Sequence, residues 1–551
     1  MKKIILSFTA LLLGSMLYAQ EDKQNTVVNV ENDYNPVVVP VKKKGFAPRE
    51  EENNDATPLE LKFSKQANPF DGFTSERDVR NFMPKQEGAY NGYARIGAGT
   101  GNSIDLKAAY NFKFNEAGEL KTFASFDGFS TKVNGLFEDH EWRSRMFGTI
   151  IDADYTHRFK GFTLNLIGNY SKKVFNYQEL VGLFGVTNKQ NCTNGSINGY
   201  ITSQLAGPFS YKAHAEIAMN HRAYSAGTDK GISEIVMNYG GTAELELSGK
   251  IFNKIGTDIN TGFYLYNSRM RRAESKYRNI FTLDVDPYIN FAINDWKIKA
   301  GIKANFRSKG GPAVAVAPDI TVEGNVAEGI GLYLEVKGDR VHNGFTAMDN
   351  ITPYWNYNAD YSMQLKPTYK PVDILFAARL SRFEPLSLEA YAGFAYIKDD
   401  LQQICGHMYN DLIYVEFAQQ DARNFYIGAK AGYDFNGWLN LSGEIRFSDW
   451  DAKYYDFLIM KPRLIADFNA EVRPIKELSL RLGYNFTHYS KGELVGRLEN
   501  KNDLYARISC QIGKRFGAFI QGNNLFDNEY YDYAGYETRG IRCMLGATMS
   551  F

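Results

Sequence analysis

From about residue 91 to the C-terminus, apolar and polar residues alternate in long segments. In the last segment, residues 541–551, the odd positions hold Ile, Cys, Leu, Ala, Met and Phe, whereas the even positions are mostly polar. Because successive side chains of a β-strand point to opposite faces, such a segment predicts a strand with one apolar face and one polar face. The segments extend to about 13 residues, which is longer than an average strand of about 5–6 residues and sufficient to cross a membrane at a tilt.

The same alternation recurs far from the C-terminus. It occupies residues 103–114, 296–307, 439–447, 464–472 and 478–486. Lys, Arg, Asp, Glu and Asn crowd the polar face of these segments, which is typical of a wall that faces a water-filled lumen. The chain is therefore predicted to be an all-β protein that folds as a transmembrane antiparallel β-barrel.

Connection lengths predict the number of strands. A bacterial outer-membrane barrel has both chain ends in the periplasm, short turns on that side and longer loops outside. Counted back from Phe551, outer connections are predicted at 525–540, 488–500, 450–460, 397–422, 341–370, 269–280, 221–239, 174–195 and 131–145, with two short ones near 99–101 and 308–311. The count gives about 22 strands, an even number as closure requires. A separate strand at Leu412–Phe417 is an alternative that changes this count.

The N-terminal part of the chain predicts export and a division into three parts. A short basic start and an apolar run, Ile4–Leu17, end near Ala19, so residues 1–19 are predicted to be a secretory signal peptide. Residues 20–88 are polar, with clustered charges and Pro, and predict an extended, flexible periplasmic segment. Residues 89–551 form the predicted barrel, which places the protein in the outer membrane with both termini in the periplasm.

Charge and motif content argue against several function classes. Lys+Arg and Asp+Glu both number 63, so no net charge draws the chain to nucleic acid. The seven His residues form no metalloprotease motif, and no Gly-x-Ser-x-Gly segment is present. No catalytic residue, cofactor or metal ligand is predicted, and the protein is expected not to be an enzyme. Export permits a disulfide between Cys192 and Cys405, and the sequence does not decide whether it forms.

A turn motif, a basic–glycine pair and a terminal aromatic follow one another near the C-terminus: Asn524, Leu525, Phe526 and Asp527, then Arg539 and Gly540, then Phe551. Together they resemble the C-terminal end of TonB-dependent receptors, although the usual order of the pair in that family is Gly-Arg. The resemblance implies an outer-membrane barrel for energised uptake of large or scarce nutrients. Family members carry a longer plug domain before the barrel. Only about 70 residues stand there in this chain, so the plug is expected to be absent.

A second resemblance lies near the mature N-terminus, in Thr26, Val27, Val28, Asn29 and Val30. This β-prone run looks like a TonB box, the segment that pairs with a TonB-like energy transducer. Strand addition depends on backbone hydrogen bonds, so its sequence requirement is loose. The alternative is a flexible tail that has no such partner.

A barrel of about 22 strands encloses a wide lumen that must be filled. The candidates are the N-terminal tail, inward-folded loops or a plugging partner protein. Loop 341–370 is predicted to bind a ligand or partner through aromatic side chains, with self-packing of the loop as the alternative. These side chains are Phe345, Tyr354, Trp355, Tyr357 and Tyr361. The basic loop 268–278 is predicted to contact lipopolysaccharide beside the surrounding outer-membrane lipid, with a solvated loop as the alternative.

The sequence supports two functions. The first is a nutrient-uptake receptor or channel component whose lumen is closed by the tail, the loops or a partner. The second is a non-transporting scaffold that anchors periplasmic or surface proteins. The substrate is not predicted by either hypothesis.

Overall fold

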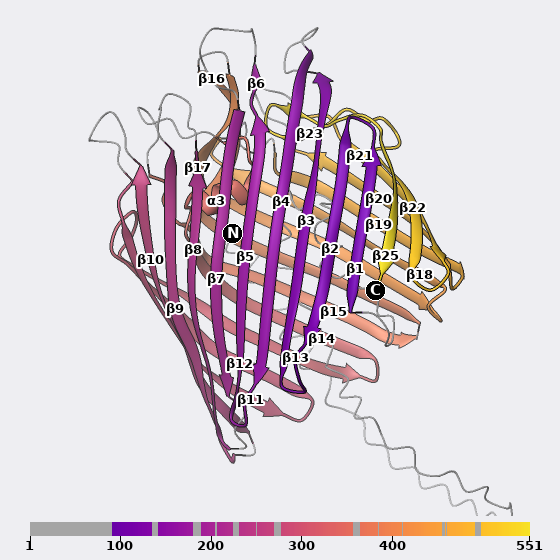
Figure 1. Cartoon of the computed structure of the whole chain (residues 1–551). Helices are drawn as coiled ribbons and strands as arrows, with labels where there is room; N and C mark the ends of the chain where they lie inside the picture. Colours follow the sequence, from indigo (N-terminus) through magenta and orange to yellow (C-terminus); the bar gives the residue numbers. More distant parts are fainter. Residues whose placement is uncertain are drawn as a thin grey trace, which may run out of the picture. The chain divides into compact units, whose positions relative to one another are not determined.

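The protein is a closed antiparallel β-barrel (Figure 1). The computed structural model describes residues 91–134, 141–179, 189–203, 207–223, 231–249, 251–268, 277–355, 364–383, 385–409, 412–454, 458, 460–490 and 498–551. Each wall strand pairs with the next one along the chain, and β1 (Gly92–Gly99) pairs with β25 (Arg542–Ser550), which closes the wall. The wall has 22 strands, so the predicted fold class is confirmed.

The remaining elements follow in chain order. The other wall strands are β2 (Ser103–Lys113), β3 (Gly118–Asn134), β4 (Glu141–Arg158), β5 (Phe162–Asn176), β7 (Lys189–Ser203), β8 (Phe209–Arg222), β9 (Ile232–Glu246), β10 (Phe252–Ser268), β11 (Ile280–Ile293), β12 (Trp296–Arg307), β13 (Val314–Ala327), β14 (Ile330–Val341), β15 (Thr368–Phe383), β16 (Leu386–Tyr409), β17 (Leu412–Phe435), β18 (Leu439–Ala452), β19 (Pro462–Ile475), β20 (Leu478–Tyr489), β21 (Lys501–Ile512) and β22 (Phe516–Asn523). Outside the wall lie β6 (Gln178–Glu179), helix α3 (Phe345–Ile351), β23 (Tyr531–Tyr533) and β24 (Tyr536–Glu537). Within the described residues, no helix is long and apolar enough to span a membrane.

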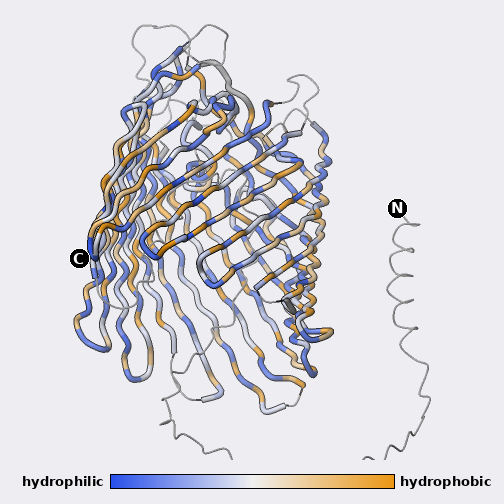
Figure 2. Tube along the Cα trace, turned by 90° about the vertical axis from the view of Figure 1, so that its right-hand side faces the viewer, coloured by the Kyte–Doolittle hydropathy of each residue, from blue (hydrophilic) through white to orange (hydrophobic). Residues whose placement is uncertain are grey.

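The apolar face of the wall strands points outward. In β25, Cys543, Leu545 and Ala547 are exposed, whereas the residues between them are half-buried. Figure 2 shows the resulting alternation of hydrophilic and hydrophobic residues along the strands. Charged side chains occupy the inner face, where Arg95 of β1 forms a buried ion pair with Asp105 of β2 at 2.8 Å. The apolar positions of the predicted alternation therefore lie on the outside of the wall, and the polar positions lie on the inside.

The two ends of the barrel differ in their connections. At the end that contains the C-terminus, neighbouring strands are joined by short turns, such as those between β11 and β12 and between β17 and β18. Asn294, Asn436 and Gly437 in these turns have positive φ angles of 52°, 49° and 72°, a conformation that tight hairpins favour. The long connections predicted from the sequence lie at the opposite end, in the predicted order.

One loop prediction is wrong, because the segment forms a paired hairpin. Residues 397–422 were expected to be one long loop, but β16 and β17 continue through this segment as a paired hairpin. The register shifts between Ile397 and Asp400 and again between Ile404 and His407. Each irregularity interrupts the strict two-residue period, which is the signal that identifies a strand in the sequence. The strand count is unchanged, because both segments extend strands that were already counted.

The predictions for the N-terminal part are not tested by this structure. The signal peptide, the extended segment 20–88 and the TonB-box-like run Thr26–Val30 lie outside the described residues. The absence of a plug domain likewise stays a prediction.

Candidate functional site in the loop layer

At the long-connection end, four segments fold against one another. They are the β5–β7 connection with β6, the β14–β15 connection with α3, the tip of the β16–β17 hairpin, and the β22–β25 connection with β23 and β24. We call this assembly the loop layer. Each segment contributes buried side chains to one apolar cluster, among them Tyr177, Tyr354, Ile413 and Tyr536. The loop layer therefore has a small core of its own, separate from the polar inner face of the wall.

β6 joins two parts of the barrel wall that lie far apart. It pairs with Leu412 and Ile413 at the start of β17. Counted around the wall, β5 is the fifth strand and β17 the sixteenth of 22, so half of the circumference separates them. A parallel bridge between Trp355 and Val415 adds the β14–β15 connection to the same hairpin. In Figure 1 the tip of β16 and β6 lie side by side at the upper end. The loop layer thus links opposite sides of the barrel.

Arg222, the last residue of β8, is the centre of the polar contacts in the loop layer. It is fully buried, and its Nη2 lies 2.6 Å from Oδ1 of Asp349 in α3. The guanidinium also donates hydrogen bonds to the carbonyl oxygens of Pro353 (3.0 Å) and Trp355 (2.8 Å). Its carbon lies 4.3 Å from the centroid of the Trp355 ring. One wall residue therefore holds both α3 and the segment that follows it.

Asp349 is surrounded by donors. It accepts hydrogen bonds from the Trp355 indole (2.6 Å), from the Cys192 thiol (2.7 Å) and from the Asn220 amide. Burial raises the pKa of Asp349, but the charge of Arg222 and these hydrogen bonds outweigh burial and hold the pKa below its usual value. Asp349 is therefore ionised, and the removal of Arg222 would leave its charge buried without a positively charged partner.

Glu234 of β9 binds the start of α3. Its Oε2 accepts hydrogen bonds from the backbone N–H of Thr346 (2.9 Å) and from the Thr346 hydroxyl (2.8 Å). Gly344 approaches the same carboxylate so closely that a Cβ at this position would overlap Glu234 Oε1. The β14–β15 connection can therefore reach the wall here only because residue 344 has no side chain.

His342 extends this contact to the neighbouring wall strands. Its Nδ1 lies 3.2 Å from Arg307 Nη1, and its Nε2 lies 2.5 Å from the Tyr266 hydroxyl. Because a guanidinium only donates, Nδ1 accepts and the proton is assigned to Nε2. The Tyr266 hydroxyl in turn donates to Glu234 at 2.7 Å. Burial lowers the pKa of His342, which keeps the ring neutral near pH 7.

The predicted ligand-binding aromatics lie in this layer. Phe345, Tyr354 and Trp355 are buried, and the rings of Tyr354 and Tyr536 stack at 3.6 Å between centroids. These three side chains therefore pack within the loop layer, which is the self-packing alternative. A ligand role for them stays a prediction and requires the loop to move. Tyr357 and Tyr361 lie outside the described residues.

The C-terminal motif builds the turn that leaves β22. Asn524 is fully buried, has a φ of 49°, and donates from Nδ2 to the carbonyl oxygens of Asn528 (3.0 Å) and Arg539 (3.2 Å). Asp527 has a φ of 53°, and its Oδ1 accepts a hydrogen bond from the N–H of Ile541 at 3.0 Å. Asn and Asp tolerate this left-handed backbone and bond to it locally. In the described structure these two residues of the motif therefore shape a turn.

The other members of the motif are divided between the turn and the wall. Phe526, which follows Leu525, is exposed. Gly540 lies so close to the turn that a Cβ at this position would be 2.6 Å from Asp527 Oδ1. Arg539 packs its guanidinium 3.4 Å above the Phe129 ring, and burial lowers the pKa of Arg539 to about 10. At the chain end, Phe551 exchanges two backbone hydrogen bonds with Gly92 of β1, at 2.7 and 3.0 Å. The last residue therefore takes part in closing the barrel.

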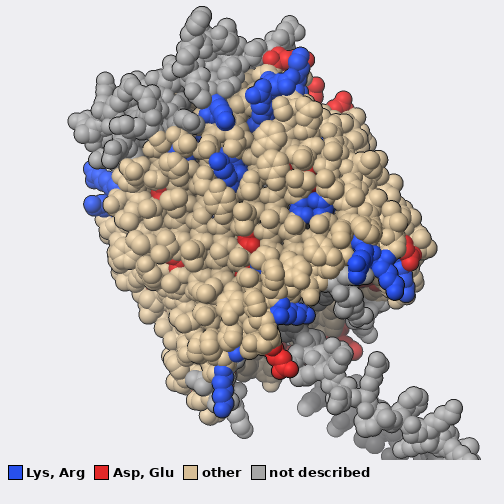
Figure 3. All heavy atoms as spheres, in the orientation of Figure 1, with Lys and Arg blue, Asp and Glu red and all other residues tan. Residues whose placement is uncertain are grey.

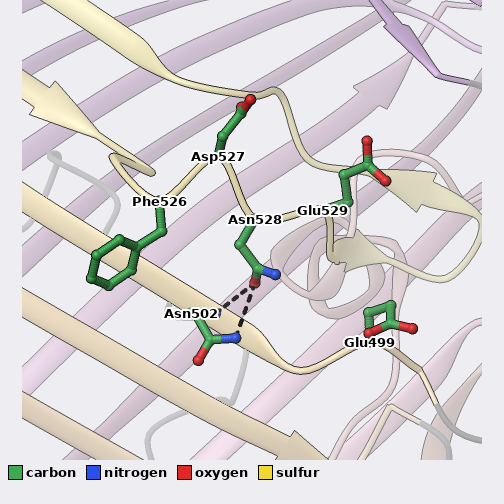
Figure 4. A pocket seen from close by; sticks show the side chains of 6 residues that line it. All are labelled: Glu499, Asn502, Phe526, Asp527, Asn528 and Glu529. Atoms are coloured by element: carbon green, nitrogen blue, oxygen red, sulfur yellow. Dashed lines mark hydrogen bonds between the residues drawn. The ribbon is translucent and has the colours of Figure 1, made fainter.

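A shallow cavity of about 590 Å³ lies beside this turn (Figure 4). It is lined by Glu499, Asn502, Phe526, Asp527, Asn528 and Glu529. Asn528 Oδ1 accepts a hydrogen bond from the backbone N–H of Asn502 at 2.8 Å. Among the described residues, no group of three or more His, Cys, Asp or Glu side chains is arranged to hold a metal ion. The carboxylates of this cavity are therefore not assigned to a metal.

The cysteines lie in two environments. Cys192 is a free, buried thiol that donates to Asp349, and the side chain of Cys405 lies outside the described residues. Cys510 and Cys543 are free and exposed on the outer face of the wall. The disulfide that export would permit is not formed by Cys192 in this structure.

Sequence reasoning missed the residues that anchor the loop layer. Arg222 and Glu234 are on the polar face of their strands, as are many other inner-wall residues, and Asp349 lies in a predicted loop. Arg222 and Asp349 are 127 positions apart, and Glu234 and Thr346 are 112 positions apart, so no local pattern marks these contacts. A polar residue that follows the last outward position of a strand, as Arg222 does, is the only hint that the sequence offers.

No protein-family model and no curated protein matches this sequence. The structure is similar to a mutant of the ferric enterobactin receptor from Pseudomonas aeruginosa, with a TM-score of 0.63, 11% identity and coverage of 84% of this chain and 80% of that chain. It is also similar to the ferric-catecholate import receptor Fiu from K12 E. coli (TM-score 0.61, 10% identity, 84% and 82% covered). The siderophore receptor PirA from Acinetobacter baumannii gives a TM-score of 0.62 at 10% identity, with 84% and 80% covered. The chain has the barrel fold of these receptors.

Proposed function

We propose that this protein is an outer-membrane receptor or channel component that takes up a nutrient. Support comes from the barrel fold, which it shares with proteins described as siderophore receptors, an import receptor and a copper transporter. The exposed apolar face of the wall fits contact with outer-membrane lipid. In this proposal residues 1–19 are removed as a signal peptide, both termini are periplasmic, and the long-connection end faces outward.

The loop layer is the observation that carries the proposed mechanism. It closes the outer end of the lumen, because β6 meets β17 from the opposite wall and Arg222 holds the β14–β15 connection. Residues 20–88 or a plugging partner close the lumen nearer the periplasm. A buried ion pair resists the loss of one partner, so the closed layer persists until a ligand or partner displaces it.

The remaining partners follow from the predicted segments. Thr26–Val30 adds a strand to a TonB-like energy transducer, which supplies the work of opening. The basic loop 268–278 contacts lipopolysaccharide at the outer surface. No step of this proposal is enzymatic.

Conductance in planar bilayers tests which part closes the lumen. Four proteins are compared: the full chain, the chain without residues 20–88, the full chain with Arg222→Met, and the truncated chain with Arg222→Met. We expect stable large conductance only in the last protein, because both closures must be removed. Conductance in the full chain would contradict closure by either element.

The scaffold hypothesis is the other outcome of this test. If all four proteins insert and none conducts, the barrel is not a channel, and anchoring of periplasmic or surface proteins becomes the better account. Co-purification from native membranes then identifies whether a plugging or anchored partner is present.

A further inference from the structure

The outer face of the wall carries a basic patch at the long-connection end of β3, β4 and β5. Its members are Lys132, Arg143, Arg145 and Lys172. Lys132 stands opposite Arg143 in the β3–β4 register, and Lys172 follows the outward Tyr170 by two positions along β5. Figure 3 shows Lys and Arg side chains gathered over the upper part of these strands, above a face with few charges. We call these four residues the basic patch.

The charge of the basic patch is not balanced. Lys132 pairs with Glu141 at 2.7 Å. Over the ranges that the structure describes, no carboxylate lies within ion-pair distance of Arg143, Arg145 or Lys172. Both Arg side chains are exposed and Lys172 is half-buried. The patch therefore offers three cations to an external anion.

A second charged region on the outer face differs in this respect. Arg423 of β17 pairs with Asp451 of β18 at 3.6 Å, and Arg463 of β19 pairs with Asp449 of β18 at 3.3 Å. These exposed side chains neutralise one another. Arg423 and Arg463 therefore differ from Arg143, Arg145 and Lys172 in having a carboxylate partner.

The basic patch lies at the edge of the apolar wall. Phe147 is the next outward residue after Arg145 on β4, and Ile151, two outward positions further, is 50% exposed. Tyr170 stands opposite Ile151 on β5. Long basic side chains at such an edge place their charge at the level of the lipid headgroups while their stems cover apolar surface. An aromatic residue at this boundary is also typical of the membrane interface.

We propose that the basic patch binds the phosphate groups of an anionic lipid in the leaflet on the long-connection side. Phosphate is the anion that fits, because guanidinium groups bind its oxygens in pairs and clustered Lys and Arg attract anionic headgroups. The inference rests on the proposed insertion into a membrane and goes beyond it by naming the lipid class and its site.

Lipid titration of the full chain tests this inference. The protein is purified and delipidated in an uncharged detergent, diphosphorylated lipid A is added, and bound lipid is counted by native mass spectrometry. R143Q/R145Q/K172Q is expected to weaken binding at least about tenfold. The matched control K398Q/R423Q/R463Q removes the same number of charges from two exposed positions of β16 and β17 and one half-buried position of β19, and is expected to change binding less than about twofold.

Further arms separate phosphate lipid from other anions. R143K/R145K keeps the charge but loses the paired guanidinium hydrogen bonds, and is expected to weaken binding by less than the triple variant does. A fatty acid, which carries a carboxylate, and inorganic phosphate at the same phosphate concentration are expected not to displace lipid A. Equal loss in the two triple variants, or displacement by either competitor, would overturn the proposal.

The proposal can fail independently of the proposed function. Folding is checked by the heat-dependent mobility of the barrel in detergent gels, and if the triple variant does not fold, Arg145→Gln alone is expected to weaken binding about threefold. A barrel that inserts into bilayers but shows no loss of lipid binding on this substitution contradicts the lipid site alone. A barrel that does not insert into bilayers contradicts the proposed function.

Discussion

The wall and the loop layer are held by different kinds of contact. In the wall, each strand pairs with a neighbour in the sequence, as β1 does with β2 from Gly92↔Tyr110 onward. In the loop layer, β6 pairs with β17, and Arg222 binds Asp349 across 127 positions. The wall can therefore stay paired while the loop layer opens, because the two sets of hydrogen bonds are separate. The two regions depend on different hydrogen bonds, so a change in the loop layer does not require a change in the wall.

The substitution with the largest expected effect on stability, Arg222→Met, acts on the loop layer alone. Arg222→Met leaves Asp349 buried and unpaired, which costs about 3–5 kcal/mol. We expect fast hydrogen exchange over residues 342–355 and unchanged exchange in the wall strands. The double variant R222M/D349L removes both charges and is expected to recover part of the protection. Slow exchange in R222M would show that the ion pair does not hold the layer.

The next effect is on the wall alone. Leu545→Arg places a charge on the outer face of β25, where Leu545 is 65% exposed, and is expected to cost about 2–4 kcal/mol in a bilayer. The folded fraction should fall in a refolding assay into lipid vesicles. Thr548→Arg on the inner face of the same strand is the control and should refold nearly as the parent does. Equal loss for both variants would mean that β25 does not face lipid at Leu545.

A smaller effect tests the close approach of the loop layer to the wall. Gly344→Ala introduces a methyl group that overlaps Glu234, and overpacking of this kind costs about 1–3 kcal/mol. Limited proteolysis should cut the β14–β15 connection faster. Gly168→Ala is the matched control, because no atom lies within 4 Å of its added Cβ. If both variants resist proteolysis equally, the approach at Gly344 is looser than the structure implies.

The smallest effect is a dependence of the loop layer on pH. Burial lowers the pKa of His342 below its ordinary 6.5, so the open layer binds a proton more readily than the closed one. The closed layer therefore loses stability as pH falls below about 6.5, by at most ~1.4 kcal/mol per pH unit. Hydrogen exchange over residues 342–355 at pH 7 and pH 5 measures this. His342→Gln should remove the difference, and a difference that persists in this variant would assign it to another group.

The sequence predicted the wall well because its signal is local. Alternation in segments such as 296–307 predicts both the strand and the face that meets lipid, and β12 spans Trp296–Arg307 as expected. The hairpin beyond Ile397 was missed where register shifts break that alternation. The aromatics Phe345, Tyr354 and Trp355 were found by composition, whereas their burial depends on partners in β8, β17 and the β22–β25 connection.

The sequence alone predicts a barrel, about 22 strands and the two faces of the wall. It does so because a two-residue period and the length of a connection are properties of neighbouring residues. The tertiary structure adds that the connections fold together and that Arg222 meets Asp349. It also leaves Arg143, Arg145 and Lys172 without a carboxylate partner over the described ranges, whereas Arg423 and Arg463 each have one. These are distances between residues far apart in the chain, and they exist only once the barrel has closed and brought its strand ends together.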